Sequence, residues 1–422
     1  MTKSIMQSIH DRIMFFVVIL QTAFFVLFET ATWGRYFFLA LMVASYVVMI
    51  IDGKGSLYLE TGLFIGHILG FICITFFSSI WARNAGEPLE KTITLVEIGL
   101  CVYPVYLYSN TKEKVHLMLT ALKWGGYLVA LYSIVYFGYD GLVHAAKAQA
   151  NRLDNTFANV NVISMCVVLA CIIEFWNLQY SKSRKEIVFL FPCILVLLAT
   201  QSRKAFVFLF VGIAGIIITK NISNERVISG IIKTIVGFLA VYYILRMASN
   251  VEAFQGIVQR LEHMINTFTG SGKTDGSSVQ RSEMVGLGIE VFKKHPIGGV
   301  GIGCTHYETY NAWRIHAYLH NNFVELLAGG GILGLCSFYW LHCYTIGFLI
   351  RNGEKEQGLT SFLFIWIILQ LITDYGMVTY YLKSQWLYFA IICAAIKTLK
   401  EGDDVDENLE ICKKSRSIYI RS

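Results

Sequence analysis

Residues 318–350 read YLHNNFVELLAGGGILGLCSFYWLHCYTIGFLI, a short polar entry followed by a long apolar run. The run from 322 to 350 is longer than the roughly 20 residues with which an α-helix crosses a bilayer. It contains no Lys or Arg, and its only carboxylate is Glu325, close to the polar entry. The stretch therefore predicts a transmembrane helix that begins at a polar loop.

The composition of the whole chain agrees with this stretch. Of the 422 residues, 55% are hydrophobic and only 15% are charged, whereas about a quarter of the residues of a soluble protein are charged. Only 4 prolines interrupt the apolar segments. This composition excludes a soluble enzyme, a disordered chain and a nucleic-acid-binding module, so no nucleic acid is expected as a partner.

Apolar segments recur along the chain and predict an all-α polytopic membrane protein with about twelve transmembrane helices. Lys3 and Arg12 precede the first segment, and no small-residue cleavage site follows it, so we expect a membrane helix rather than a removable signal. The twelve segments are 13–29, 36–51, 58–80, 93–109, 115–138, 157–179, 187–200, 205–219, 227–246, 322–350, 359–378 and 385–398.

The distribution of Lys and Arg predicts the topology. If the N-terminus is cytoplasmic, one set of short loops and the C-terminal tail hold most of the basic residues, as the positive-inside rule requires. Both termini are therefore expected in the cytoplasm. The basic residues left on the outer side are candidates for function, and in the short connections they are Arg35, Arg83, Lys91, Lys147, Arg152, Arg203, Lys204 and Lys383.

One polar segment, 247–320, interrupts the pattern and is expected on the outer side. Apolar residues recur at helical spacing over 251–268, and a second helix is expected at about 279–294. A loop of this length with its own helices is usually functional. The expected organisation is N-terminal membrane helices (1–150), central membrane helices (151–246), the external loop (247–320), C-terminal membrane helices (321–398) and a cytoplasmic tail (399–422).

Several familiar motifs are absent or incomplete. The ten cysteines form no CxxC pair and no Cys/His cluster, so neither a disulfide framework nor a metal site is predicted. GSGKT (270–274) resembles the end of a phosphate-binding loop, but Thr267 occupies the position of its first glycine. GGVGIG (298–303) lacks the dinucleotide-binding spacing, and no strand precedes it. We interpret both as turns.

Two arginines on the predicted outer side have the chemistry to bind phosphate. Arg203 lies in QSRKA (201–205) between two apolar spans, where its alternative role is to anchor a helix end. Arg281 opens the second loop helix, where the alternative is a solvated face. A guanidinium binds phosphate oxygens through two parallel hydrogen bonds, and free amides at a helix N-terminus also attract anions.

The stretch NRLDNTFANVN (151–161) opens the sixth span from the same side. Arg152 adds a cation there. Asn159 or Asn161 is either a polar ligand or a helix cap and nothing more.

His320 lies where the external loop enters the tenth span. An imidazole titrates near neutrality, so it suits a general base, and the alternative is an interfacial hydrogen bonder. Asn322 followed by Glu325 matches a helix-capping arrangement, which gives Glu325 a structural alternative. Glycines 329–331 and 334 allow close helix contact without any chemistry.

These stretches, in this order, resemble the O-antigen ligase/polymerase superfamily over roughly residues 150–340. The matching pieces are an Arg followed by F-x-N-x-N, an S-R between two spans, an Arg opening a helix that ends in H-P-x-G-G-x-G, and an H-N before a Gly-rich span. In this chain they are Arg152, Phe157, Asn159, Asn161, Ser202, Arg203, Arg281, His320 and Asn321.

The resemblance implies a metal-independent, cofactor-free glycosyltransferase with a GT-C-like fold in the bacterial plasma membrane, its active site facing the periplasm or exterior. The implied donor is a polyprenyl diphosphate-linked glycan, whose diphosphate Arg203 and Arg281 bind as it leaves. His320 deprotonates or orients the acceptor hydroxyl. The expected substrate-binding residues are Arg152, Asn161, Arg260, Asn321 and Glu325.

Two activities fit this resemblance. A polymerase extends a chain on lipid-linked repeat units, and the H-N-N-x-x-E-L-L form favours it; a ligase transfers the glycan to a lipid A core or another acceptor. A transporter or flippase would be expected to bury charges in its spans and to show repeated halves. The expected partners are the lipid-linked donor and acceptor and membrane lipids, with a chain-length regulator as a further candidate.

The topology is testable by cysteine labelling in a background without native cysteines. Because Thr274 lies in the predicted external loop, a cysteine there should react with a membrane-impermeant reagent in intact cells. Labelling only after permeabilisation would contradict the topology.

Overall fold

A computed structural model describes residues 9–28, 34–52, 62–146, 158–180, 184–222, 226–248, 258, 262, 276–353 and 357–419, and these residues form an all-helical bundle. The first half of the chain forms α2 (Ile9–Leu27), α3 (Gly34–Asp52), α4 (Leu63–Phe77), α5 (Gly86–Tyr108), α6 (Lys112–Ala146) and α7 (Val160–Tyr180). The second half forms α8 (Leu190–Thr200), α9 (Arg203–Ile222), α10 (Val227–Ala248), α12 (Gly276–Lys294), α13 (Thr305–Trp313), α14 (Asn322–Arg351), α15 (Gln357–Gly376) and α16 (Lys383–Tyr419). Two 3₁₀ turns, η1 (Ser78–Ile80) and η2 (Ile187–Phe189), precede α5 and α8.

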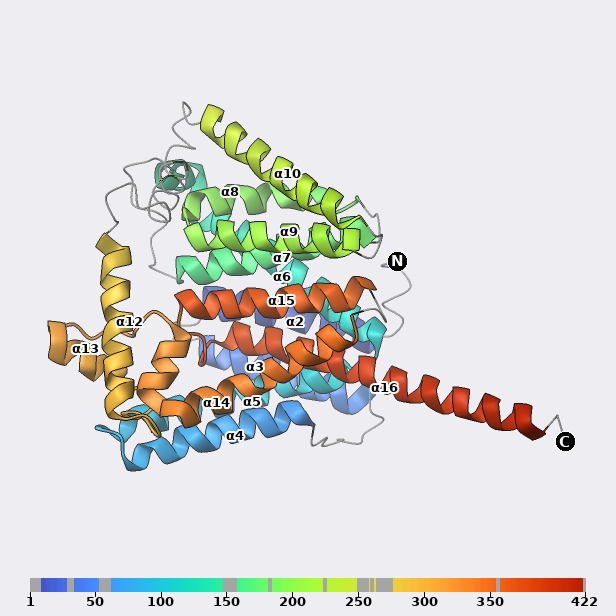
Figure 1. Ribbon diagram of the computed structural model, residues 1–422. Helices are drawn as coiled ribbons and strands as arrows, with labels where there is room; N and C mark the ends of the chain where they lie inside the picture. Colours follow the sequence, from blue (N-terminus) through green and yellow to red (C-terminus); the bar gives the residue numbers. More distant parts are fainter. Residues whose placement is uncertain are drawn as a thin grey trace.

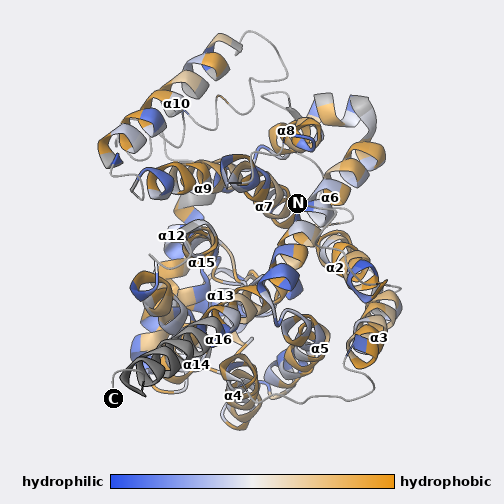
Figure 2. Ribbon diagram, turned by 90° about the vertical axis from the view of Figure 1, so that its right-hand side faces the viewer, coloured by the Kyte–Doolittle hydropathy of each residue, from blue (hydrophilic) through white to orange (hydrophobic). Residues whose placement is uncertain are grey.

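The long helices run side by side along one direction, whereas α12 and α13 lie across one end of the bundle (Figure 1). The last part of α16 extends from the opposite end (Figure 1). Helix α6 packs against α2, α7 and α8, and α14 packs against α4 and α15. Seen along the bundle, α10 lies at its edge, where it packs against α9 (Figure 2).

Each of the twelve predicted apolar segments contains an α-helix. Within the described part of the chain, seven helices are long and apolar enough to cross a membrane, and three shorter apolar helices accompany them. Large apolar side chains also remain exposed along α10, as expected for a helix face in contact with lipid. The chain is thus an all-helical polytopic membrane protein. The number of twelve spans and the GT-C type stay predictions.

Polar contacts join the segments that connect the helices, and these contacts fall into two groups, one at each end of the bundle. At one end, Trp81 donates to the carbonyl of Gly298 and Gln201 donates to that of Ala145. At the other end, Lys114 pairs with Asp52, Trp176 donates to the carbonyl of Gly358, and Lys220 contacts Gln179. These are the two groups that alternating spans require, and the end that faces the exterior stays a prediction.

Helix α14 is interrupted at Gly331, whose φ of 61° and ψ of −158° are not helical. The turn at 296–301 enters this interruption. The amides of Val300 and Gly301 donate to the carbonyls of Ala328 and Gly329, at 2.9 and 2.8 Å. On the other side of the break, the amides of Ile332 and Leu333 donate to the carbonyls of Pro296 and Ile297, at 2.9 and 3.3 Å. The turn therefore completes the hydrogen bonding that α14 loses.

Two glycines make this close approach possible. A Cβ on Gly331 would lie 2.2 Å from the carbonyl oxygen of Ile297, and one on Gly299 would lie 2.4 Å from Gly329. Both residues also have positive φ, which an L side chain rarely adopts. The interpretation of GGVGIG as a turn is confirmed, and the glycines of α14 face this turn.

Two expectations need correction. Lys123 and Glu174 are 3% and 2% exposed inside predicted spans and form an ion pair of 2.8 Å, so charges are buried within the spans, a feature expected only of a transporter or flippase. Helix α12 begins at Gly276, three residues before the predicted start. The predicted helix at 251–268 and Thr274 fall almost wholly outside the described residues.

Replacing Gly331 by alanine should destabilise the folded protein, because Ala must adopt a positive φ and displace the backbone of the turn. These effects together predict a loss of about 2–4 kcal/mol. The matched control is Gly347→Ala, since Gly347 lies on the same helix and a Cβ added there would meet nothing within 4 Å. Thermal unfolding in detergent would measure both variants, and equal melting temperatures would contradict the role given to Gly331.

Candidate functional site

Two of the sequence motifs meet where α7 and α9 begin. Asn161 lies in the first turn of α7, and Ser202 directly precedes Arg203, the first residue of α9. The hydroxyl of Ser202 donates to Asn161 Oδ1 at 3.4 Å. Two segments about forty residues apart in sequence are therefore adjacent. Asn161 is hydrogen-bonded to Ser202, the residue directly before the predicted phosphate ligand Arg203.

The α8–α9 turn fixes the two cations that follow it. Gln201 is buried, has a φ of 47°, and donates through Nε2 to the carbonyl of Ala145 at 2.6 Å. Arg203 and Lys204 then occupy the first turn of α9, and both are half-buried. Lys204 donates to the carbonyl of Gly376, the last residue of α15. The start of α9 is thus tied to the α15–α16 connection.

His320 lies immediately before α14 in a left-handed backbone conformation, with a φ of 57°. Its ring packs on Tyr318, with ring centroids 4.3 Å apart. Burial, followed by the positive charges of Arg281 and Lys204, lowers the pKa of His320 from 6.5 to about 4. The structure therefore brings three of the predicted segments together, and it keeps the imidazole neutral at physiological pH.

Tyr318 is near enough to Arg281 and Glu325 for both charges to act on its hydroxyl. Burial raises the pKa of its hydroxyl, the nearby Arg281 opposes that rise, and Glu325 adds to it. Tyr318 nevertheless keeps 39% of its surface exposed. An aromatic ring that is open to solvent therefore adjoins the imidazole of His320.

The two asparagines after His320 have different roles. Asn321 is the N-cap of α14 and accepts a hydrogen bond from the amide of Val324 at 3.1 Å. Asn322 is fully buried, and its Oδ1 accepts from the amides of Thr379 and Tyr380 at 2.9 and 3.1 Å. The predicted cap at Asn322 was wrong by one residue, because Asn322 instead binds the α15–α16 connection.

A buried polar chain continues from Asn322 into the bundle. Asn322 Nδ2 donates to the hydroxyl of Tyr339 at 2.8 Å, and Tyr339 donates to Asp374 Oδ2 at 2.8 Å. Thr379 donates to the other oxygen of Asp374. The sequence motifs did not predict this polar chain. Its available signal was Asp374 itself, because a carboxylate inside an apolar span is usually retained for a purpose.

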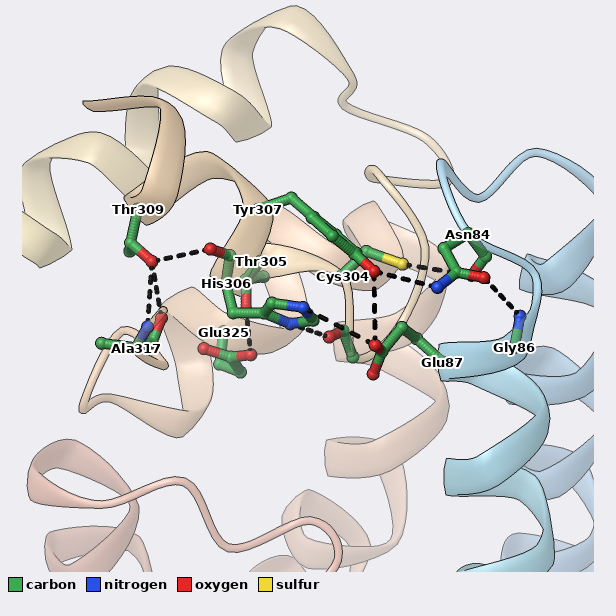
Figure 3. A network of polar contacts seen from close by, with 11 residues as sticks. Asn84, Gly86, Glu87, Cys304, Thr305, His306, Tyr307, Thr309, Ala317 and Glu325 are labelled. Atoms are coloured by element: carbon green, nitrogen blue, oxygen red, sulfur yellow. Dashed lines mark hydrogen bonds and ion pairs between the residues drawn. The ribbon is translucent and has the colours of Figure 1, made fainter. Parts of the chain in front are cut away.

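Glu325 accepts hydrogen bonds from protein donors through both oxygens. The hydroxyl of Thr305 donates to Oε1, and the amide of Leu319 donates to Oε2 at 2.9 Å (Figure 3 shows the first of these). The side chain is 4% exposed. These contacts favour the structural alternative for Glu325 over contact with a substrate.

Helix α13 is held against the start of α5 by polar contacts (Figure 3). His306 Nε2 lies 3.6 Å from Glu87 Oε1, and the hydroxyl of Tyr307 accepts from Asn84 Nδ2 at 2.9 Å. The hydroxyl of Thr309 donates to the carbonyl of Ala317 at 2.9 Å, which ties α13 to the segment that leads to His320. The approach to His320 is therefore anchored on both sides.

Two predicted substrate-binding residues, Arg152 and Arg260, lie outside the described residues. Over the ranges that the structure describes, no group of three or more His, Cys, Asp or Glu side chains is placed to hold a metal ion. Chemistry without a metal or cofactor stays a prediction, as do the individual roles of Arg203, Arg281 and His320.

A comparison with known families identifies this region. The O-antigen ligase family model matches residues 188–339, a range that contains Arg203, Arg281, His320 and the first half of α14. No curated protein matches the chain.

Proposed function

We propose that the chain polymerises polyprenyl diphosphate-linked oligosaccharide repeat units into a surface polysaccharide, a proposal that the match of residues 188–339 to the O-antigen ligase family model supports. The reaction takes place at the outer face of the bacterial plasma membrane. The observation that carries this proposal is that His320, at the entrance to α14, lies near the positive charges of Arg281 and Lys204. A base that can accept a proton thus adjoins cations suited to a diphosphate.

The proposed reaction is a single displacement at the anomeric carbon of the donor glycan. His320 accepts the proton of the acceptor hydroxyl, whose oxygen then forms the new glycosidic bond. The bond from the anomeric carbon to the diphosphate oxygen breaks, and its electron pair stays on the lipid diphosphate. Arg203 and Arg281 stabilise this developing charge through charge-assisted hydrogen bonds.

Transfer to a lipid A core or another acceptor is the second candidate, because the matching family model is described as an O-antigen ligase. Both activities use the same donor and the same site residues, and they differ in the acceptor. Purified protein supplied with lipid-linked repeat units alone distinguishes them: a polymerase forms longer lipid-linked chains, whereas a ligase requires a different acceptor.

The transporter alternative receives less support. The buried Lys123–Glu174 pair agrees with the buried charges expected of a transporter. The family match favours an enzyme, since the matched family is that of O-antigen ligases.

Replacing Arg203 or Arg281 by alanine should abolish chain extension without preventing folding, because each loses a two-pronged phosphate contact. Lysine at either position should restore activity only in part, since it lacks this geometry. The matched control is Arg83→Ala, an exposed arginine over the ring of Tyr307. Polymer length on gels measures the effect, and near-normal length in both alanine variants would refute the diphosphate role.

Replacing His320 by alanine should lower the rate about 10²–10⁴-fold, the usual contribution of a positioned base. Donor binding should persist, because the arginines carry it, and a chelator should not affect the wild-type enzyme. Replacements of His306 and His316 serve as controls and should have much smaller effects. A fully active His320→Ala variant, or loss of wild-type activity with chelator, would contradict the mechanism.

The same base should determine the acid limb of the pH profile. Since the pKa of His320 is lowered to about 4, kcat/KM should fall only as the pH drops toward 4, not near 6.5. Lys204→Met removes a positive charge that opposes protonation, so its acid limb should move to higher pH. An unchanged limb in this variant would mean that another group titrates.

A further inference from the structure

We infer that Glu325 is a positioning residue for His320: its carboxylate fixes the backbone from which the imidazole projects. This inference rests on the proposed function, because it concerns the same base. It assigns to Glu325 a role through His320 rather than contact with a substrate.

The carboxylate bridges two segments that flank the base. Oε2 accepts from the amide of Leu319, the residue directly before His320, at 2.9 Å. Oε1 accepts from the hydroxyl of Thr305, the first residue of α13 (Figure 3). Glu325 is only 4% exposed, and each of its oxygens already has a protein donor. The side chain is therefore placed to hold the loop against α14.

The backbone of His320 needs such support. A φ of 57° is unfavourable for a residue with a Cβ, and conformations of this kind persist only where their surroundings fix them. The Glu325 bond holds Leu319 on one side of His320, and the cap from Asn321 to Val324 holds the other side. Both residues next to His320 in sequence, Leu319 and Asn321, are thus held by hydrogen bonds.

The carboxylate of Glu325 strengthens both of its hydrogen bonds more than an amide would. Two separate donors point at the two oxygens of Glu325, whereas the side chain of Gln offers one acceptor oxygen and an NH₂ group that can only donate. Glu325→Gln keeps the shape of the side chain, but its neutral oxygen can accept only from Leu319 while its NH₂ group donates to the hydroxyl of Thr305, so two charge-assisted hydrogen bonds become two weaker neutral ones. This variant therefore loosens the support of His320 with little change in packing.

The first test compares Glu325→Gln with wild-type enzyme on purified lipid-linked repeat units. A base displaced by about 1 Å is expected to lower the rate by up to about 100-fold, so kcat should fall about 10- to 100-fold while KM for the donor stays unchanged. The matched control is Glu308→Gln on α13, which should behave like wild type. A raised KM with unchanged kcat would show that Glu325 contacts the substrate, and it would overturn the inference.

The second test separates positioning from a general structural role. If Glu325 acts only through His320, adding Glu325→Gln to His320→Ala should cause no further loss of residual kcat, since the two effects belong to one interaction. If the two losses multiply, the inference is wrong.

A further variant covers the case in which Glu325→Gln does not fold, as judged by gel filtration and thermal unfolding. Thr305→Val removes one of the two donors and leaves the carboxylate bound to Leu319. It should lower kcat by a smaller factor at unchanged KM, and unchanged kcat would overturn the inference. Failure of the proposed function looks different: a fully active His320→Ala refutes the base itself, whereas an inactive His320→Ala beside a fully active Glu325→Gln refutes only the positioning role.

Discussion

The interruption of α14 at Gly331 is the constraint from which the site follows. Inside a bilayer no water is present to satisfy backbone amides and carbonyls, so a broken membrane helix needs partners from within the protein. The turn at 296–301 supplies them, through hydrogen bonds on both sides of the break. The polar loop is thereby fixed to a membrane helix by its backbone, and α13 follows directly from that turn.

The same attachment explains how the polar segment before α14 holds His320 in place. Starting from the turn, α13 is fastened to α5 through Glu87 and Asn84, and Thr305 reaches the carboxylate of Glu325. Farther on, Asn322 binds the connection between α15 and α16, to which Lys204 also donates. The segments that carry His320 and Arg203 therefore share one rigid neighbour, although more than one hundred residues separate them in sequence.

Hydropathy predicted much of this fold, because the bilayer imposes one requirement on every span. Each of the twelve apolar segments contains a helix, and the order of the four motifs led to the family that the comparison supports. The failures have a different origin. The cap at Asn321, the Lys123–Glu174 pair and the chain to Asp374 each depend on which partner lies opposite a side chain. Spacing along a single chain does not contain that information.

The pKa of His320 depends more on the surroundings of the side chain than on its being a histidine. From the sequence, a value near 6.5 is expected for a histidine, whereas burial and the charges of Arg281 and Lys204 lower the pKa to about 4. So low a pKa makes the free imidazole a weak base. A bound diphosphate would counter those positive charges, and a nearby negative charge raises the pKa of a histidine. In the proposed reaction the bound donor therefore strengthens the base that deprotonates the acceptor, so proton transfer from the acceptor is favoured only after the lipid diphosphate is in place.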